Sequence, residues 1–419
     1  MSWLNVELYG VLLGTLSQKI NGVDFEVSPD VFVKYSLSST IMSLAVPLNL
    51  RFTAPQKKRG SNFFKELLPE GRNLRWLEQS LPPSERNPYG ILRKYGKDIA
   101  GALIVYDPED PVSSIEAKAE KAGPEKVRYL LEHMPQEPLA NSPVSGKTSL
   151  GGVQGKIVLA RKGESWYRAH FGYPSTHILK PVVPEYPTMI YDEAFCMQLA
   201  ESSGLTEHPV WIESFDGADA LVVERYDRNN AFAGRVHQED FNQALGAHGN
   251  EKYQEHGGKV SAKRIAQTLA KFGQSEDVLV FASQLVFAIA IGNLDMHAKN
   301  VSMLHLPDES IKLAPVYDQA PLCHHGTDGR MALSIGGEYR HAHLSLTDIV
   351  SELACWQCSC FKDKAGITAF IENCLEKYGN ALNSIVPDGK AYPGLKKDIS
   401  MFISNLLNGK RIGKSNSQI

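Results

Sequence analysis

The sequence predicts an α+β protein with two lobes and an extra small N-terminal domain. Short strand patterns occur along the chain up to about residue 228, whereas the part from Glu239 to the end follows mainly helical patterns. An acidic, proline-rich stretch at 107–111 interrupts the first part. We therefore expect an N-terminal subdomain at 1–106, a linker with a short helix at 107–144, a strand-rich N-lobe at 145–235 and a mainly helical C-lobe at 236–419.

Strands and turns dominate the N-terminal part. Residues 4–9 and 102–106 have the composition of short strands, and the pairs Pro82-Pro83 and Asn87-Pro88 are turn signals between them. Residues 124–133 form an amphipathic pattern that begins at a proline, which predicts a short helix.

Helical patterns dominate the C-terminal half. Residues 278–291 are apolar almost all round, as expected of a helix buried in a core. This run is too short and too interrupted for a membrane span, which needs about 20 apolar residues. Residues 349–358 and 397–403 also predict helices, and we expect the polar tail at 410–419 to fray.

The composition is that of a soluble globular protein. Hydrophobic residues make up 43% and charged residues 22% of the 419 residues, enough for a sizeable core in two or three domains. The 44 Lys and Arg residues against 47 Asp and Glu residues give a formal net charge of -3, so charge alone provides no drive toward nucleic acid. Residues 1–7 lack the basic segment and long apolar run of a secretion signal, which predicts a cytoplasmic protein.

The most informative polar residues follow the apolar helix directly. Asp295 and Asn300 have the D-x-x-x-x-N spacing of a kinase catalytic loop, in which the Asp accepts the proton of a substrate hydroxyl and the Asn holds Mg²⁺. Asp318 is the expected second metal ligand, because Mg²⁺ prefers hard oxygen donors. His297 and Lys299 would add positive charge near a transferred phosphoryl group. The pattern predicts ATP-dependent phosphoryl transfer.

Chance is the alternative for this motif alone, since such spacings occur in ordinary polar loops. The context favours a site. A cluster of acid, amide, His and Lys directly after a buried helix is costly unless it binds something.

A second set of residues is typical of nucleotide binding. The glycine-rich stretch 148–156 would let main-chain N–H groups approach a phosphate, with Lys156 adding a charge; its spacing is not that of a Walker A loop, and an ordinary turn is the alternative. Lys180, in the strand pattern at 176–181, is the expected kinase lysine. Glu193 begins a helical pattern and is either the partner of Lys180 or an acid favoured by the helix dipole.

Residues 220–228 predict a buried strand that breaks into a charged turn. In a two-lobed kinase, main-chain groups at this point would meet the adenine ring. The alternative for Asp227 and Arg228 is a solvated turn.

The order of these parts along the chain resembles that of the HipA family, the serine/threonine kinase toxins of bacterial HipBA toxin–antitoxin modules. The resemblance covers nearly the whole chain and rests on residues 63–72, 149–156, 176–181, 223–228, 237–240, 293–300 and 317–318. It implies a two-lobed protein-kinase-like fold, ATP and Mg²⁺ as cofactors, and a location in the bacterial cytoplasm.

The resemblance also assigns roles to residues. Asp295 corresponds to the catalytic base, Asn300 and Asp318 to metal ligands, and Ser149 to an autophosphorylated serine whose phosphate would repel ATP and silence the enzyme. The residues implied to bind ATP are Gly151, Gly152, Val153, Gln154, Gly155, Lys156, Lys180, Glu224, Arg225, Tyr226, His297, Ala298, Lys299, Asn300, Tyr317 and Asp318. Gly155 departs from the bulkier polar residue common in the family, and Leu294 and Met296 replace commoner polar residues.

Partners follow from the resemblance as well. It implies glutamyl-tRNA synthetase as the protein substrate, growth arrest as the outcome, and a HipB-like helix-turn-helix antitoxin through which the chain would sit on operator DNA as a corepressor. A catalytically idle corepressor or scaffold is the alternative, and a kinase acting on a small metabolite is a third. The combination of Lys180, Asp295, Asn300 and Asp318 argues against an idle scaffold.

The cysteines suggest a different metal. Cys355, Cys358 and Cys360 form a C-x-x-C-x-C pattern, and Cys323-His324-His325 lies upstream, so together they offer the ligand types that zinc prefers. However, the cluster lies in a helical pattern and no second C-x-x-C follows. We expect reduced, mostly buried thiols rather than a zinc site.

Overall fold

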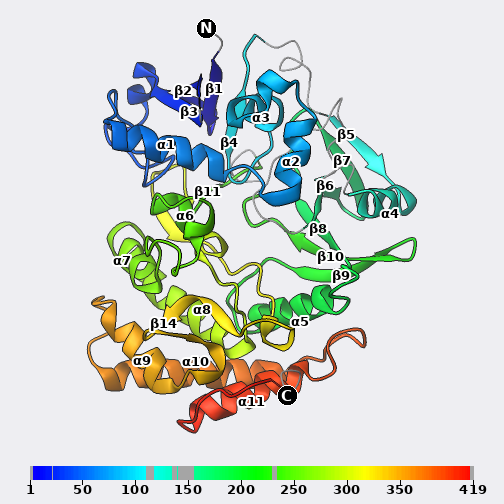
Figure 1. Cartoon of the computed structure of the whole chain (residues 1–419), viewed down its shortest axis with the longest axis vertical. Helices are drawn as coiled ribbons and strands as arrows, with labels where there is room; N and C mark the ends of the chain where they lie inside the picture. Colours follow the sequence, from blue (N-terminus) through cyan, green and yellow to red (C-terminus); the bar gives the residue numbers. More distant parts are fainter. Residues whose placement is uncertain are drawn as a thin grey trace.

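A computed structural model describes residues 3–20, 22–109, 118–134, 139, 155–228 and 234–415. Three parts pack against one another (Figure 1): the N-terminal subdomain in blue, a strand-rich lobe in cyan and green, and a helical lobe that runs from green to red. Within the described ranges, no helix combines the length and the apolar character needed to span a membrane.

A four-stranded antiparallel sheet, in the order β3-β2-β1-β4, forms the centre of the N-terminal subdomain. Its strands are β1 (Leu4–Leu8), β2 (Val11–Lys19), β3 (Gly22–Val27) and β4 (Leu103–Tyr106). The remaining elements are α1 (Ala54–Glu66), α2 (Gly71–Gln79), α3 (Pro88–Tyr95) and the 3-10 turns η1 (Pro29–Val33) and η2 (Pro83–Glu85). Alternate residues of β1 are buried, as a strand with one face on a core requires. The strands predicted at 4–9 and 102–106 are confirmed.

The strand-rich lobe contains a six-stranded sheet in the order β5-β7-β6-β8-β10-β9. Its strands are β5 (Lys118–Ala122), β6 (Ile157–Lys162), β7 (Ser165–His170), β8 (His177–Pro181), β9 (Val210–Phe215) and β10 (Ala218–Glu224). The predicted short helix is present as α4 (Pro124–Glu132), but it is not part of a linker. Val127 and Leu130 of α4 share one apolar core with Leu159 and Val222, and β5 pairs with β7, so residues 118–132 belong to this lobe.

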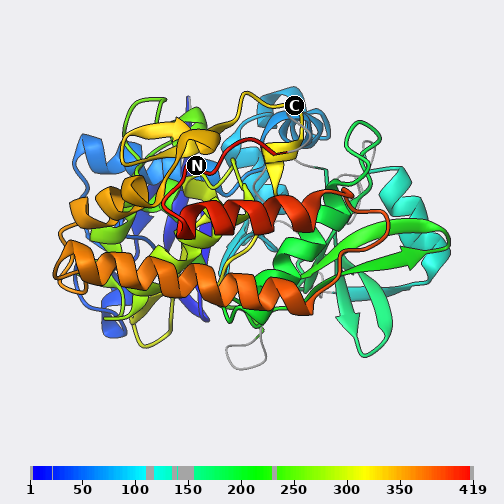
Figure 2. The same cartoon turned by 90° about the horizontal axis from the view of Figure 1, so that it is seen from below.

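The helical lobe is built around α8 (Asp277–Ile291). Phe281, Phe287 and Ile289 of α8 are fully buried, which confirms the helix predicted from an apolar run without a polar face. The other helices are α5 (Met189–Ser202), α6 (Phe241–Ala244), α7 (Ala262–Phe272), α9 (Leu346–Cys355), α10 (Lys364–Ser384) and α11 (Leu395–Leu407). Figure 2 shows α10 and α11 side by side on the lower face.

Two small sheets interrupt the mainly helical pattern expected for this lobe. The first, in the order β11-β12-β13, consists of β11 (His237–Asp240), β12 (Ser302–His305) and β13 (Ile311–Leu313). The second is the hairpin of β14 (Arg330–Ile335) and β15 (Glu338–Arg340). The 3-10 turns are η5 (Gly249–Lys252), η6 (Ala298–Asn300), η7 (Leu322–His324) and η8 (His341–His343). Strands β12 and β13 of the first sheet lie in the chain between residues 295–300 and Asp318. The first sheet therefore separates the two segments that carry the candidate site.

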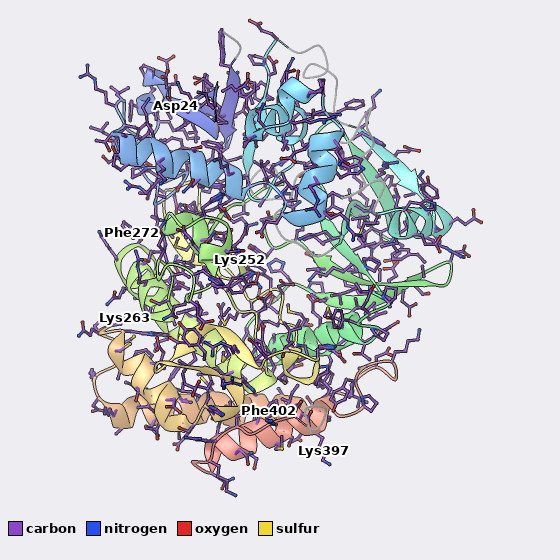
Figure 3. All side chains as sticks on the ribbon, viewed as in Figure 1. Asp24, Lys252, Lys263, Phe272, Lys397 and Phe402 are labelled. Carbon is purple, nitrogen blue, oxygen red and sulfur yellow. The ribbon has the colours of Figure 1, made fainter. Side chains whose placement is uncertain are left out.

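The beginning of the C-terminal tail is packed rather than frayed. Ile412 is fully buried and donates its main-chain N–H to Leu344 O at 2.8 Å. Ser415 Oγ donates to Cys323 O at 3.2 Å. In the helix before the tail, Phe402 of α11 (labelled in Figure 3) packs edge-on against His341. The expectation of fraying is therefore wrong for residues 410–415, and 416–419 lie outside the described residues.

The charged turn after β10 is buried, so the alternative of a solvated turn is wrong. Arg225 Nη2 lies 2.8 Å from Asp227 Oδ2, and Arg228 Nη2 lies 2.9 Å from Asp98 Oδ1 of the N-terminal subdomain. Arg235 reaches the same Asp98 oxygen at 3.5 Å. Burial opposes the ionisation of Asp98, but the three arginines hold its pKa below the ordinary value.

Removing the acid at the centre of this network leaves three buried arginines with one carboxylate. We expect Asp98→Ala to lower the free energy of unfolding by about 3–5 kcal/mol, the usual effect of breaking a buried ion pair from one side. Urea unfolding of the full chain measures this loss. The exposed Asp30→Ala is the matched control, and an equal effect of both variants would contradict the prediction.

Candidate active site

The segment 293–300, which carries Asp295 and Asn300, begins where α8 ends. Gly292 adopts a left-handed conformation with φ 74°, and an added Cβ would collide with Cys323 Sγ, so glycine suits this reversal. Asn293 follows and is buried. Its Oδ1 accepts from Asp295 N at 2.9 Å, while its Nδ2 donates to Asp318 O at 3.4 Å. Asn293 therefore joins the two loops that carry Asp295 and Asp318.

Asp295 is held at the edge of the site with its carboxylate partly open. Its Oδ1 accepts from the Tyr253 hydroxyl at 3.1 Å, and its Oδ2 lies 3.8 Å from His297 Nε2. The side chain is 42% exposed, so a substrate hydroxyl has access to it. Partial burial raises the pKa of Asp295, and His297 opposes that rise. Asn300 Nδ2 donates to Asp295 O at 2.9 Å, which orients the Asn300 amide.

Lys180 joins three elements at one point. Its Nζ lies 2.8 Å from Glu193 Oε1 of α5 and 2.5 Å from Asp318 Oδ1. The pairing expected between Lys180 and Glu193 is therefore present. Burial disfavours the ammonium, but the two carboxylates outweigh it and raise the pKa of Lys180. Burial likewise disfavours the Asp318 carboxylate, but Lys180 lowers the pKa of Asp318 to about 2.

Lys156, directly before β6, faces the same charges. Burial and the neighbouring Lys180 lower the pKa of Lys156 to about 8, while Asp318 acts in the opposite direction. A second ammonium beside Lys180 makes this point favourable for an anion. Gly155 is also described, but Ser149, Gly151, Gly152, Val153 and Gln154 lie outside the described residues.

Lys299 is engaged by the N-terminal subdomain. Its Nζ lies 2.8 Å from Glu66 Oε2 and 2.9 Å from Glu70 Oε1. Glu70 also binds Lys252, a buried lysine near the middle of the molecule (Figure 3), at 3.1 Å. The Lys299 ammonium, which was predicted to contact the nucleotide, therefore already has two anionic partners. The main chain of η6, with the buried Ala298, lies next to it.

Tyr226, in the turn after β10, contacts Tyr317, in the loop before Asp318. Their ring centroids are 5.3 Å apart at 36°. The Tyr317 hydroxyl donates to Lys299 O at 2.7 Å, which fixes its ring. Arg225 N donates to Thr176 O at 3.0 Å, and the Arg225 side chain belongs to the buried network rather than to an open pocket. The main-chain N–H of Tyr226 donates to no other described residue.

Several residues of the site carried no role in the sequence analysis. Asn293 entered only within the range 293–300 of the family resemblance, and Tyr253 has no sequence signal because it lies 42 residues before its partner Asp295. Glu66 and Glu70 were quoted only for the family resemblance of the N-terminal segment. Glu224, placed at the hinge, lies 3.9 Å from His208.

The cysteine cluster does not form the zinc site considered as an alternative. Cys355 is exposed, Cys358 is buried and Cys360 is intermediate, and all three are free thiols. Among the described residues, the one group with the spacing of metal ligands consists of Asp192, His324 and His325, without any of these cysteines.

Two family models match the chain: the HipA-like C-terminal domain at residues 148–382 and the HipA N-terminal domain at residues 4–106. The chain belongs to the HipA family. A putative kinase, Y4mE, of Sinorhizobium fredii is 32% identical over 347 residues, covering 80% of each chain. The serine/threonine-protein kinase toxin HipA of Shewanella oneidensis is 28% identical over 360 residues, covering 80% of this chain and 79% of that one.

The fold agrees with the family. A solved complex of Shewanella oneidensis HipA, HipB and operator DNA contains a chain that matches this one with a TM-score of 0.75 and 22% identity, covering 97% of this chain and 96% of that chain. The expected two-lobed, kinase-like α+β fold with an extra N-terminal domain is therefore confirmed.

Replacing Lys299 by an uncharged residue tests whether this lysine stabilises the fold or contacts the nucleotide. Lys299→Met leaves Glu66 and Glu70 facing each other, although His248 still lies 2.6 Å from Glu66. We expect the free energy of unfolding to fall by about 3 kcal/mol, at the lower end for a broken buried pair. The exposed Lys362→Met is the control. A large loss of ATP affinity with unchanged stability would instead indicate a direct nucleotide contact.

Proposed function

We propose that this HipA-family protein is an ATP-dependent serine/threonine protein kinase. The observation that carries the proposal is the geometry of Lys180, which binds Glu193 and Asp318 while Asn293 joins the Asp318 loop to Asp295. Kinases need a lysine for the phosphates, a metal-binding acid and a base for the hydroxyl. The kinase names of the relatives support the same reading.

The residues divide the work of phosphoryl transfer. Lys180 and Lys156 bind the phosphates of ATP, and the Tyr226 main chain meets adenine at the hinge. Asp318 and the Asn300 amide oxygen would hold Mg²⁺; the orientation of Asn300 fits, because its Nδ2 is used by Asp295 O and its Oδ1 accepts from no other described residue. The bound metal would neutralise charge on the phosphates. Asp295 takes the proton of the attacking hydroxyl, which then bonds to the γ-phosphorus as ADP leaves.

The proposal also covers how the kinase is regulated, which protein it phosphorylates and which partners it binds. The family resemblance supports autophosphorylation at Ser149 that silences the enzyme, and glutamyl-tRNA synthetase as the substrate whose modification arrests growth. The HipA–HipB–operator complex of Shewanella oneidensis supports a HipB-like antitoxin as partner and operator DNA as a ligand reached through it. A catalytically idle corepressor remains the second candidate, favoured by the same complex.

Intact-mass spectrometry tests the proposed activity. The full chain, first shown to be unmodified, is incubated with Mg-ATP, and peptides are mapped. We expect one added phosphate at Ser149 in the wild type, and at least about 100-fold slower transfer in Asp295→Ala, because a general base contributes about that much or more. ATP affinity should be retained in Asp295→Ala, since the base acts in the chemical step.

Three comparisons sharpen that experiment. The exposed Asp328→Ala should behave as wild type. Ser149→Ala should take no phosphate at that position yet modify glutamyl-tRNA synthetase. An Asp295→Ala protein as active as wild type would refute the mechanism, and an ATP-binding wild type that phosphorylates neither itself nor the synthetase would favour the corepressor.

The pH dependence of the same activity tests the role of Tyr253. Asp295 accepts a proton only when ionised, so activity falls as pH drops through the pKa of Asp295. Burial raises that pKa and the Tyr253 hydroxyl lowers it. Tyr253→Phe removes the lowering contact, so the acid limb of the rate profile should move to higher pH by about one unit. Tyr129→Phe on the surface is the control, and a limb that stays in place or moves to lower pH would contradict the assignment.

A further inference from the structure

A second polar cluster lies beside the candidate active site but is not part of it. Asp192 belongs to the first turn of α5, and His324 and His325 follow Asp318 along the chain at η7. Asp192 is fully buried, and the side chains of His324 and His325 are 4% and 12% exposed. Figure 1 shows α5 between strands β9 and β10 and the C-terminal helices, so the cluster lies where the two lobes meet.

The spacing of the three side chains fits one ion. Asp192 Oδ2 lies 3.0 Å from His324 Nε2 and 3.9 Å from His325 Nε2, and the potential ligand atoms lie within 4.8 Å of one another. Nitrogen and oxygen ligands bind zinc at about 2.0–2.2 Å, so two ligands of one ion lie about 3–3.5 Å apart. The first pair has this spacing already, the second needs a shift of less than about 1 Å, and the two histidine nitrogens must approach to the same spacing from at most 4.8 Å.

His325 supplies the observation that points to a ligand. Its Nε2 is buried and accepts or donates no hydrogen bond among the described residues. A buried ring nitrogen without a partner costs free energy, whereas a metal ion would use its lone pair. The ring is held by edge-on packing against Tyr186, with centroids 5.4 Å apart.

The other two ligands are held in place by their neighbours. The His324 ring stacks on Tyr392 with centroids 4.4 Å apart at 10°. Tyr392 N donates to Asp192 Oδ1 at 2.7 Å, and Thr188 Oγ1 donates to Asp192 Oδ2 at 2.7 Å. Contacts of this kind orient the ligands of metal sites and are part of what sets their affinity.

We propose that Asp192, His324 and His325 bind one divalent transition metal ion of the zinc type, with water completing the coordination. Two imidazoles and one carboxylate are a common ligand set for zinc, whereas Mg²⁺ and Ca²⁺ prefer oxygen ligands alone. His324 binds the ion through Nε2 in the tautomer that carries its hydrogen on Nδ1. The ion replaces the direct hydrogen bond between His324 and Asp192.

The site ties α5 to the segment that follows Asp318. Glu193, the residue after Asp192, holds Lys180, and Lys180 holds Asp318. A bound ion would therefore fix the two elements that position the candidate phosphate-binding lysine. This consequence rests on the proposed kinase function, whereas metal binding itself does not.

Zinc binding to the full chain tests the proposal without any assay of activity. Chelator-treated protein is titrated with Zn²⁺ against a chromophoric competitor in excess Mg²⁺, which occupies oxygen-only sites. We expect one zinc per chain and a higher thermal unfolding temperature with zinc, because a ligand that binds the native state stabilises it. His325→Gln should weaken zinc binding at least about tenfold and abolish the thermal shift.

The choice of variants keeps the outcome clear. His325 Nε2 makes no hydrogen bond with a described residue, whereas its ring packs on Tyr186, so each variant is compared with its own zinc-free unfolding temperature. His343→Gln, an exposed histidine paired with Glu338, should bind zinc as wild type does. Cys355→Ser should also retain binding. Absence of zinc binding in the wild type, unchanged affinity in His325→Gln, or loss of binding in Cys355→Ser would each overturn the proposal.

Discussion

The ammonium of Lys180 is the interaction on which the site depends. A buried charge is tolerated only when it is paired, and Lys180 is buried between Glu193 and Asp318. Its partners come from α5 and from the loop after β13, so one ammonium fixes three elements that the chain brings together from distant positions. Asp318 has φ 56°, a conformation that costs free energy for a residue other than glycine. The ion pair with Lys180 helps to stabilise that conformation.

The N-terminal subdomain contacts both sides of the candidate site. Through Asp98 it pairs with Arg225 and Arg228 in the turn after β10, and through Glu66 it pairs with Lys299 in the segment 293–300. These contacts are buried and charged, so they are directional, and separating them would leave unpaired charges on both surfaces. The subdomain therefore helps to hold both segments of the candidate site, and a partner that displaced it would disturb the turn after β10 and residues 293–300 together.

The sequence predicted those features of the fold and the site that depend on residues close to one another in the chain. The apolar run of α8, the strand that carries Lys180 and the spacing of Asp295 to Asn300 were all legible, and so was the likeness to HipA. Contacts between distant residues were not. Lys299 was predicted to contact a phosphate because its partner in the fold could not be seen from the local sequence. That partner, Glu66, lies 233 residues earlier. For Asp227 and Arg228 the sequence left a solvated turn as an alternative, because Asp98, the partner that buries this turn, lies 130 residues before Arg228. The zinc alternative combined His324 and His325 with cysteines close in sequence and missed Asp192, which lies 132 residues before His324.

In helix α5, polar contacts determine the rotation and height of the helix, which apolar packing alone does not determine. Its burial is almost complete, so its apolar side chains stabilise the helix but distinguish poorly between small rotations about its axis. Asp192 and Glu193 are adjacent and therefore point about 100° apart around the helix. One contacts His324 and Tyr392, and the other contacts Lys180. Only one rotation and one height of α5 satisfy both sets of partners, which makes the first turn of this helix the point where the lobes are aligned.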